Sequence, residues 1–324
     1  MKKQLSLLGI ILASSVTLGG CAFGTAQSKL NGVATDLLRA NSFHVVADIT
    51  QGSTNAGQGE QKTHFDGTLD LRTATNIKAD GTLTTQGATI EPAMNAHIIV
   101  TDAVYIQFQS LNYPGSPFTI TPTVQNTFYK VASENLSDLL PGGSVAAQQD
   151  RLSEDQKKQI RDAIHKAKFF TLVEKKGTEK IGGKRASHYT VKLNGPELTQ
   201  LSDTINAIAG TTSDPASKQS LQKQIDALSA TPFDVWLSQF GGHLLQVSFA
   251  FTTGSDRTSG TFVFDQFNDK KEITTPTNTK PFDQLFTDLG SNIKENLGPS
   301  VDLNATIDPD ALKSLQAELD KITR

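Results

Sequence analysis

The chain has 324 residues, with 30 lysines and arginines against 33 aspartates and glutamates, which gives a formal net charge of −3 at pH 7. This acidic balance argues against nucleic acid as a partner, and against docking of the whole chain to anionic lipid through charge. The chain contains a single cysteine, so it cannot form an internal disulfide and must be stable without covalent cross-links.

The first 21 residues, MKKQLSLLGIILASSVTLGGC, have the three parts of a secretory signal: a basic start, an apolar stretch over residues 5–18, and small residues before a cleavage site. The segment Leu18-Gly19-Gly20-Cys21 resembles the lipobox of bacterial lipoproteins. That resemblance implies cleavage between Gly20 and Cys21 and acylation of the Cys21 thiol. A membrane span is disfavoured, because the apolar stretch is shorter than the roughly 20 residues that a span needs. A secreted protein cleaved elsewhere is the alternative.

Cleavage also affects how the chain is attached to the membrane. Removal of residues 1–20 takes away two lysines and changes the formal net charge from −3 to −5. We therefore expect attachment to the extracytoplasmic face of the cell membrane through acyl chains on Cys21, rather than through charge. Residues 21–29 are expected to be the lipidated cysteine and a flexible polar tether. Whether the host has an outer membrane stays open.

A short helix is expected around residues 30–40, and alternating apolar and polar residues then predict strands with one buried face. The first group of strands is expected at 43–50, 65–71, 77–83, 94–100, 104–108 and 128–131. A second group is expected at 169–175, 187–193, 233–237, 245–251, 261–267 and 271–275. Gly182 and Gly183 supply the positive φ of a tight turn between two of them.

Amphipathic helices are expected where a capping residue or a proline precedes apolar residues at helical spacing. The expected starts are Ser153, Pro196, Pro215, Pro281 and Pro309. These segments predict one α+β domain over residues 30–290, a large antiparallel sheet with helices packed on its apolar side. Two subdomains divided near residue 145 are the alternative. Residues 291–324 are expected to be a linker and a C-terminal helix.

Several short segments that are expected to form hairpins resemble segments of a known family. They are Asp102-Ala103-Val104-Tyr105-Ile106, Ile181-Gly182-Gly183-Lys184 with His188-Tyr189-Thr190-Val191, and Val235-Trp236-Leu237 with Gly242-His243-Leu244-Leu245. In style and order they resemble lipoproteins of the LolA/LppX-type fold, including mycobacterial LppX/LprG lipoproteins and the periplasmic carriers of lipoprotein localisation. The resemblance implies a curved, unclosed half-barrel sheet with helices on its concave face and an apolar cavity for acyl chains. It carries over no functional residue except the lipidated cysteine.

No residue is proposed as catalytic or metal-binding, and no cofactor is expected. None of the six histidines stands in a metalloprotease pattern, and the chain has no nucleophile elbow, P-loop or dinucleotide fingerprint. His44 with Asp48, and His64 with Asp66 and Asp70, are interpreted as solvated residues on the outer face of the strands. An enzyme is therefore not expected.

Five aromatic residues on strands predicted to be neighbours form the candidate lining of an apolar cavity. They are Trp236, Phe249, Phe251, Phe262 and Phe264. The same residues also suit an ordinary core, and the sequence does not separate the two. A basic run around the turn at 181–184 indicates either contact with anionic headgroups or, preferably, edge-strand charge that discourages aggregation. It comprises Lys175, Lys176, Lys180, Lys184 and Arg185.

Two functions fit these observations. The first is a membrane-anchored envelope lipoprotein that binds or transfers a lipid, a lipoprotein or another amphiphile in an apolar cavity. The second is a non-enzymatic envelope scaffold or sensor that binds another protein. The second predicts a filled core and an exposed apolar patch in place of a cavity. The identity of a protein partner stays open.

Overall fold

The structure is a computed structural model that describes residues 25–53, 60–72, 78–87, 93–112, 122–131, 152–210, 215–269, 271–285 and 287–289. The expected signal peptide, the cleavage site between Gly20 and Cys21 and the helix after Pro309 lie outside these residues. In the described part of the chain, no helix has the length and hydropathy to cross a membrane.

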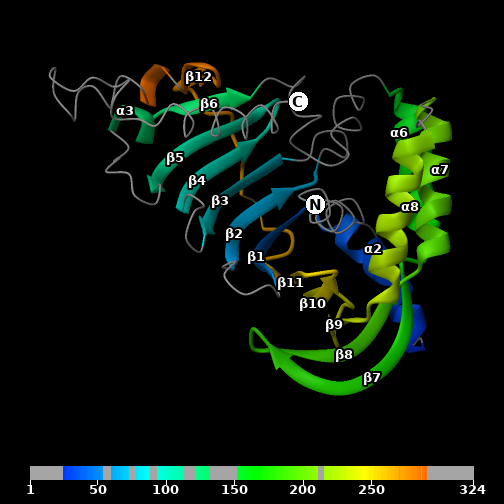
Figure 1. The fold of residues 1–324 in the computed structure, drawn as a ribbon. Helices are drawn as coiled ribbons and strands as arrows, with labels where there is room; N and C mark the ends of the chain where they lie inside the picture. Colours follow the sequence, from blue (N-terminus) through cyan, green and yellow to red (C-terminus); the bar gives the residue numbers. More distant parts are fainter. Residues whose placement is uncertain are drawn as a thin grey trace, which may run out of the picture.

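One sheet contains every strand that the structure describes (Figure 1). The first six strands are β1 (Ser42–Ser53), β2 (Gln61–Asp70), β3 (Lys78–Gln86), β4 (Ala93–Val100), β5 (Val104–Asn112) and β6 (Phe128–Val131). The other six are β7 (Phe170–Ile181), β8 (Lys184–Leu193), β9 (Phe233–Ser238), β10 (Leu244–Thr253), β11 (Asp256–Asp265) and β12 (Thr279–Pro281). The described helices are α2 (Ala26–Arg39), α3 (Pro122–Gln125), α6 (Glu154–Lys166), α7 (Gly195–Ala209) and α8 (Pro215–Ala230).

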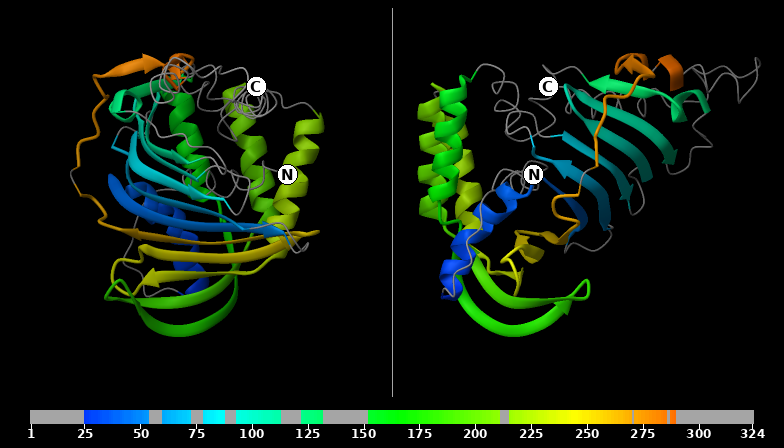
Figure 2. Two further views of the ribbon diagram at one scale, coloured as in Figure 1. Left: turned by 60° about the vertical axis from the view of Figure 1, so that its left-hand side comes forward. Right: turned by 180° about the vertical axis from the view of Figure 1, so that it is seen from behind.

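The 12 strands follow the order β12-β6-β5-β4-β3-β2-β1-β11-β10-β9-β8-β7. The sheet does not close, because β12 and β7 are its two edges, and Figure 2 shows how strongly it curves. The ladders are antiparallel except the one between β12 and β6, which is parallel. The predicted curved, unclosed sheet of an α+β fold is therefore confirmed. It differs from the prediction in that one pair of strands is parallel.

The register of the ladders assigns each side chain to one of two faces. On β1, Phe43, Val45 and Ala47 are buried and point to the concave side, towards the helices, because neighbouring residues of a strand point to opposite faces. His44 and Asp48 lie on the convex face, with their cross-strand partners Asp265 and His64. The alternation read from the sequence therefore places both faces of β1 correctly.

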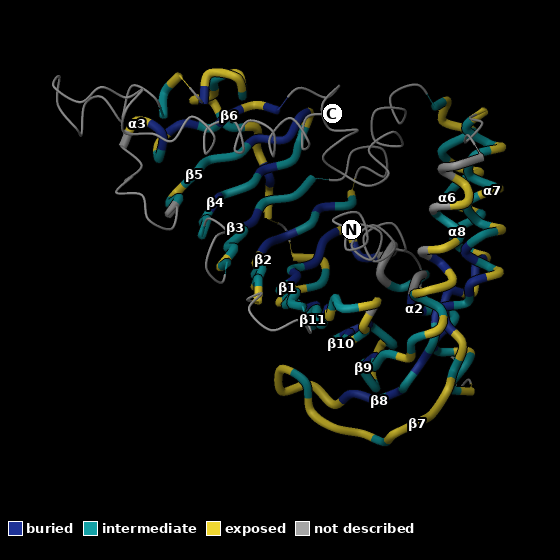
Figure 3. The backbone as a smooth tube through the Cα atoms, in the orientation of Figure 1, coloured by how far each residue is buried: buried dark blue, intermediate teal, exposed yellow. Residues whose placement is uncertain are grey.

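The longer helices cover one part of the concave face. Figures 1 and 3 show α2, α6, α7 and α8 together beside the β7 end of the sheet. Their main contacts with strands are those of α2 with β7 and β10 and of α8 with β8. The largest apolar cluster joins these helices to the sheet, with Leu30 of α2, Leu198 of α7 and Ile225 of α8 buried against Val191 and Val235. The core of the molecule is thus concentrated at this end.

The ends of these helices follow the capping signals in the sequence. At the start of α6, the Ser153 hydroxyl accepts a hydrogen bond from the Gln156 backbone N–H, and the Gln156 side chain accepts one from the Ser153 N–H. This is the predicted capping box. At the end of α7, Gly210 adopts a left-handed conformation with φ of 68°, a conformation that glycine adopts without steric cost.

The segment after β11 corrects one predicted strand. Residues 271–275 form no ladder and instead run along the convex face towards β12 at the far edge of the sheet. Ile273 is buried there against Ile99, Ala103 and Tyr105, and the Lys271 ammonium lies 2.9 Å from an Asp80 carboxylate oxygen. The β-branched residues that suggested a strand are used for packing on the sheet rather than for pairing within it. We call residues 271–278 the convex strap.

Two further expectations differ in detail from the structure. Helix α2 begins at Ala26, so the last residues of the expected tether at 21–29 are helical. The Thr25 hydroxyl caps this helix by accepting a hydrogen bond from the Ser28 N–H, which explains why it starts there. The helix expected after Pro281 is present and begins at Gln284; among the described residues, 284–285 and 287–289 are helical.

Candidate functional site

Four of the five predicted cavity residues lie on the concave face. Phe249 stacks with Phe251 and with Phe262, at ring-centre distances of 5.8 and 6.0 Å. Phe264 meets Phe43 edge to face at 5.8 Å and belongs to the large core cluster. The structure therefore brings these four rings to one face of neighbouring strands β10 and β11.

Trp236 is on the other side of the sheet, which corrects its inclusion in that group. It packs on the convex face with Ala186 and Leu245, and its ring stacks on His188 with a centre-to-centre distance of 4.2 Å. Its indole N–H donates a hydrogen bond of 2.6 Å to Glu179. The alternation in β9 contains the signal for this, because Val235 and Leu237 take the concave positions and leave Trp236 the convex one.

Glycines allow aromatic rings to lie flat on the concave face. A Cβ built on Gly67 of β2 would lie 2.6 Å from the ring carbon Cζ of Phe65, and one on Gly81 of β3 would lie 2.7 Å from the same atom. In the same way, a Cβ on Gly260 would lie 2.7 Å from Cζ of Phe249. Any other residue at these positions would push the ring away from the sheet. The glycines therefore let the aromatic rings lie close to the backbone of the sheet.

The concave face continues as an apolar surface across β2 to β5. Leu83, Ile98 and Ile106 are half-buried there, and among the described residues none of them belongs to an apolar cluster. They are contiguous with Phe65: its ring covers Gly81, Gly81 pairs with Ile98, and Ile98 pairs with Ile106. We call Phe65, Leu83, Ile98 and Ile106 the apolar floor.

The apolar floor lies between two packed regions. On one side is the large core under α2, α7 and α8, and on the other is a smaller cluster at the β6 edge, where Val124, Tyr129 and Leu285 are buried. The main helix–strand contacts in the described residues fall on β5, β7, β8 and β10, so β5 is the one strand of the floor among them. An apolar surface that is partly exposed between two packed cores is a suitable place for an apolar ligand.

The convex face is polar and carries histidines paired with carboxylates. His44 hydrogen bonds to Asp66 on β2 at 2.7 Å and to Asp265 on β11 at 2.8 Å. Burial alone would lower the pKa of His44, but these two hydrogen bonds outweigh it and raise the pKa above its ordinary value. Three more pairs have distances of 2.6–2.7 Å: His64 with Asp48, His97 with Asp80, and His188 with Glu179.

These pairs tie strands together, and among the described residues no group of three or more histidine, cysteine or acidic side chains is arranged to hold a metal ion. The sequence placed His44 and His64 on the outer face, as the structure shows. It did not find their partners, because it matched His44 with Asp48 of the same strand rather than with Asp66 and Asp265 on neighbouring strands.

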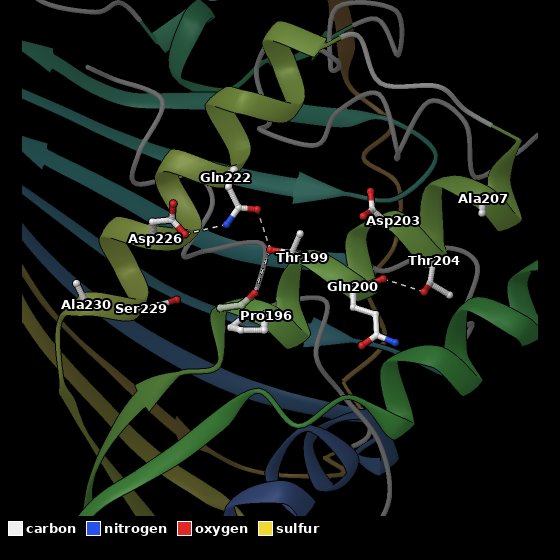
Figure 4. Close-up of a pocket in the computed structure, with 11 residues that line it drawn as sticks. Pro196, Thr199, Gln200, Asp203, Thr204, Ala207, Gln222, Asp226, Ser229 and Ala230 are labelled. Atoms are coloured by element: carbon white, nitrogen blue, oxygen red, sulfur yellow. Dashed lines mark hydrogen bonds between the residues drawn. The ribbon is translucent and has the colours of Figure 1, made fainter.

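A groove of about 950 Å³ lies between α7 and α8 (Figure 4). Seven of its 11 lining residues carry polar side chains. The Thr199 hydroxyl donates to Gln222, and the Gln222 amide donates to Asp226 at 2.8 Å. Asp203 on the α7 side pairs with Lys218 at 3.4 Å. The groove is open to solvent and none of the five predicted cavity residues lines it, so it does not correspond to the predicted cavity.

No protein-family model matches the chain, and no curated protein matches it. Among solved structures, the lipoprotein LppX of Mycobacterium tuberculosis aligns with 76% of this chain and 97% of its own, at 16% identity and a TM-score of 0.38. LprF from Mycobacterium bovis aligns with 85% of this chain and 97% of its own, at 12% identity and a TM-score of 0.36.

A third structure is described as an outer membrane lipoprotein-sorting protein domain, from Vibrio parahaemolyticus. It aligns with 77% of this chain and 90% of its own, at 12% identity and a TM-score of 0.19. Both groups that the expected hairpin segments resemble, LppX-type lipoproteins and lipoprotein-sorting proteins, are thus among the structures to which this chain is similar. With TM-scores under 0.5, these likenesses carry no argument about function.

Proposed function

We propose that the apolar floor binds the acyl chains of a lipid or another amphiphile. The observation that carries this proposal is the unbroken apolar path from Phe65, at the border of the large core, over Gly81 to Ile98 and Ile106. Ile98 and Ile106 are half-buried and belong to no apolar cluster among the described residues. Acyl chains need apolar area rather than directed hydrogen bonds, and a curved sheet face supplies it. The glycines add depth, because a ring that lies flat leaves space above it.

The experiment compares two neighbouring residues of β3 that point to opposite faces. We expect Leu83→Asp to weaken uptake of a fluorescent fatty acid or phospholipid by about tenfold or more, because a carboxylate on the floor must be desolvated by the ligand. Thr84→Asp is the matched control, since Thr84 is also half-buried but lies on the convex face opposite His64. It should bind like the unaltered protein.

Organic extraction of the purified protein followed by mass spectrometry provides an independent readout. We expect an amphiphile to co-purify with the unaltered chain and with Thr84→Asp, and to be lost from Leu83→Asp. If no amphiphile co-purifies and none is taken up from vesicles, the floor is not a lipid site. The alternative of a scaffold or sensor that binds another protein would then be favoured.

We also propose that the mature chain is held at the extracytoplasmic face of the membrane by acyl chains on Cys21. Helix α2 is fixed beside the start of β7, where the Gln27 amide donates to the Phe170 carbonyl at 2.7 Å and accepts from the Leu172 N–H at 2.8 Å. Cys21 is four residues before Thr25, a reach of about 14 Å at most. This end of the sheet would therefore be close to the bilayer.

Intact mass measurement of protein extracted from membranes tests the anchor. The unaltered chain should start at Cys21 and carry the added mass of acyl chains, and it should partition into detergent. A chain expressed from residue 22 onward should carry no acyl mass and should no longer partition into detergent. Detection of unaltered chain that starts at another residue, without acyl mass, would refute the anchor and leave the lipid-site proposal intact.

A further inference from the structure

The turn between β9 and β10 presents an aromatic side chain to solvent. Phe240 is 80% exposed, the higher of the two large exposures among the described apolar residues. The turn around it is well fixed: the Ser238 hydroxyl donates to the Phe240 carbonyl at 2.6 Å, and the Ser238 N–H donates to the His243 carbonyl at 2.8 Å. Gly241 and Gly242 follow with φ of 90° and 73°. The backbone of this turn is therefore well ordered and presents the Phe240 ring to solvent.

Basic side chains lie on the β7–β8 hairpin beside this turn. The Gln239 N–H donates to the Arg185 carbonyl at 3.0 Å, which holds the turn beside the start of β8. Lys184 precedes Arg185, and Lys180 pairs with Arg185 across the β7–β8 hairpin. All three cations are exposed, and within the described part of the chain none of them forms an ion pair.

Two acids lie close to these turns. The Asp36 carboxylate lies beside Gly242, where an added Cβ would be 2.9 Å from its Oδ2. Glu179 accepts a hydrogen bond from the Trp236 indole and lies 2.7 Å from His188. The three cations outnumber these two acids, so this end has a local excess of positive charge on a chain whose formal net charge is −3. The whole-chain charge, which argued against electrostatic docking to lipid, does not describe this end.

The two turns share one end of the sheet, because Ala186 of β8 pairs with Ser238 of β9. Figure 1 shows the β7–β8 hairpin curving away from α6, α7 and α8, with its turn at the free end. Lysines on an edge strand are explained by protection against aggregation, but an exposed phenyl ring is not. An aromatic ring among cations instead suits the interface of an anionic bilayer, where rings lie at headgroup level and Lys and Arg meet lipid phosphates.

We propose that this end of the sheet, formed by Phe240 with Lys180, Lys184 and Arg185, docks on the surface of an anionic lipid bilayer. The inference is independent of the ligand proposed for the apolar floor. The ring enters the headgroup region and the three cations contact anionic headgroups beside it. Because the turn is already fixed, docking requires little ordering of the chain.

Flotation with vesicles tests the docking. The mature chain from residue 22 onward is used, so that neither acyl chains nor the apolar signal segment contribute. We expect it to float with vesicles of equal parts phosphatidylcholine and phosphatidylglycerol, and to stay in solution with phosphatidylcholine alone. Phe240→Ser should reduce partitioning by about tenfold, and Lys184→Gln by about fivefold, as for loss of one buried ring and of one basic residue near a charged surface.

Matched controls separate this site from general effects. Val173→Ser removes the other strongly exposed apolar side chain, which is 53% exposed in β7, and Lys158→Gln removes an exposed lysine on α6. Both should float like the parent. Equal flotation with the two kinds of vesicle overturns the proposal, and so does a Phe240→Ser variant that floats undiminished. Binding to an acidic protein surface without binding to anionic vesicles would also overturn it.

Fluorescence provides a second readout on the same turn. In the Phe240→Trp variant, anionic vesicles should shift the emission of the new tryptophan to the blue, and brominated lipids should quench it. Val173→Trp is the control and should show neither effect above the background of Trp236. Quenching that is equal in the two variants would show that the turn is not the contact point.

Discussion

At the scale of single residues, histidines on the convex face act as cross-strand ties. His44 bridges β2 and β11 across the central strand β1, through Asp66 and Asp265. Because these contacts raise the pKa of His44, the protonated ring is bound more tightly in the folded chain than in the unfolded chain. The stability from this bridge is thus fully present below the unfolded pKa and is lost as pH rises through the folded pKa.

This sign gives a pH-dependent prediction. We expect His44→Gln to lower the free energy of unfolding by about 1 kcal/mol near pH 5, the size expected for charge-assisted hydrogen bonds in a partly exposed site. Near pH 8 the difference should be much smaller, because the ring is then neutral in both states. Urea denaturation of both proteins at the two pH values measures this, and a difference that does not change with pH would contradict it.

Residue-level prediction from sequence worked where it depended on strand alternation alone. The convex position of His44 follows from the pattern of β1, and the convex position of Trp236 was available from the pattern of β9. The partners of His44 could not be predicted from the sequence, because Asp265 lies beside His44 only when the first and eleventh strands pair. The flat ring of Phe65 was equally hidden, because it depends on two glycines that become neighbours only in the folded sheet.

At the scale of elements, the convex strap shows how a segment without strand partners is held. Ile273 is 2% exposed and packs on Ile99 and Tyr105. The hydroxyls of Thr101 and Thr275 lie 2.9 Å apart, and Thr275 also donates to Asp102 at 3.3 Å. Sequence alternation predicted a strand here because a strap that lies across a sheet and a strand that pairs within it both favour β-branched residues.

The strap should therefore depend on a single buried side chain. We expect Ile273→Ala to lower the free energy of unfolding by about 2–4 kcal/mol, as for other large-to-small changes at buried positions. The neighbouring Thr274→Ala should change it by less than about 0.5 kcal/mol, since Thr274 is exposed. Urea denaturation measures both variants, and a similar small effect at the two positions would show that the strap contributes little.

At the scale of the whole molecule, the sheet separates its tasks by region. The helices and the large core lie at the β7 end, the apolar floor crosses β2 to β5, and histidine–carboxylate pairs occupy the convex face. The sheet, its helices and their caps were readable from sequence because each depends on local periodicity. The order of the strands was not, because β1 pairs with a strand more than 200 residues later in the chain.

The two proposed membrane contacts lie at opposite ends of β7. The anchor approaches the start of the strand through α2, whereas Phe240 and its basic neighbours stand by the turn at its end. The strand has 12 residues and a contour length of about 40 Å. With both contacts made, the anchored protein would have one orientation on the bilayer.

The two edges of the sheet also govern how this chain meets other copies of itself. An open sheet offers unpaired backbone groups to any passing strand, yet each edge here is a poor template. β7 carries register shifts at Leu172/Glu174 and Lys175/Gly177, and β12 has three residues and ends in Pro281, which has no N–H to donate. Fibre growth by strand addition is therefore blocked at both ends, so a large sheet can stay soluble at high local concentration.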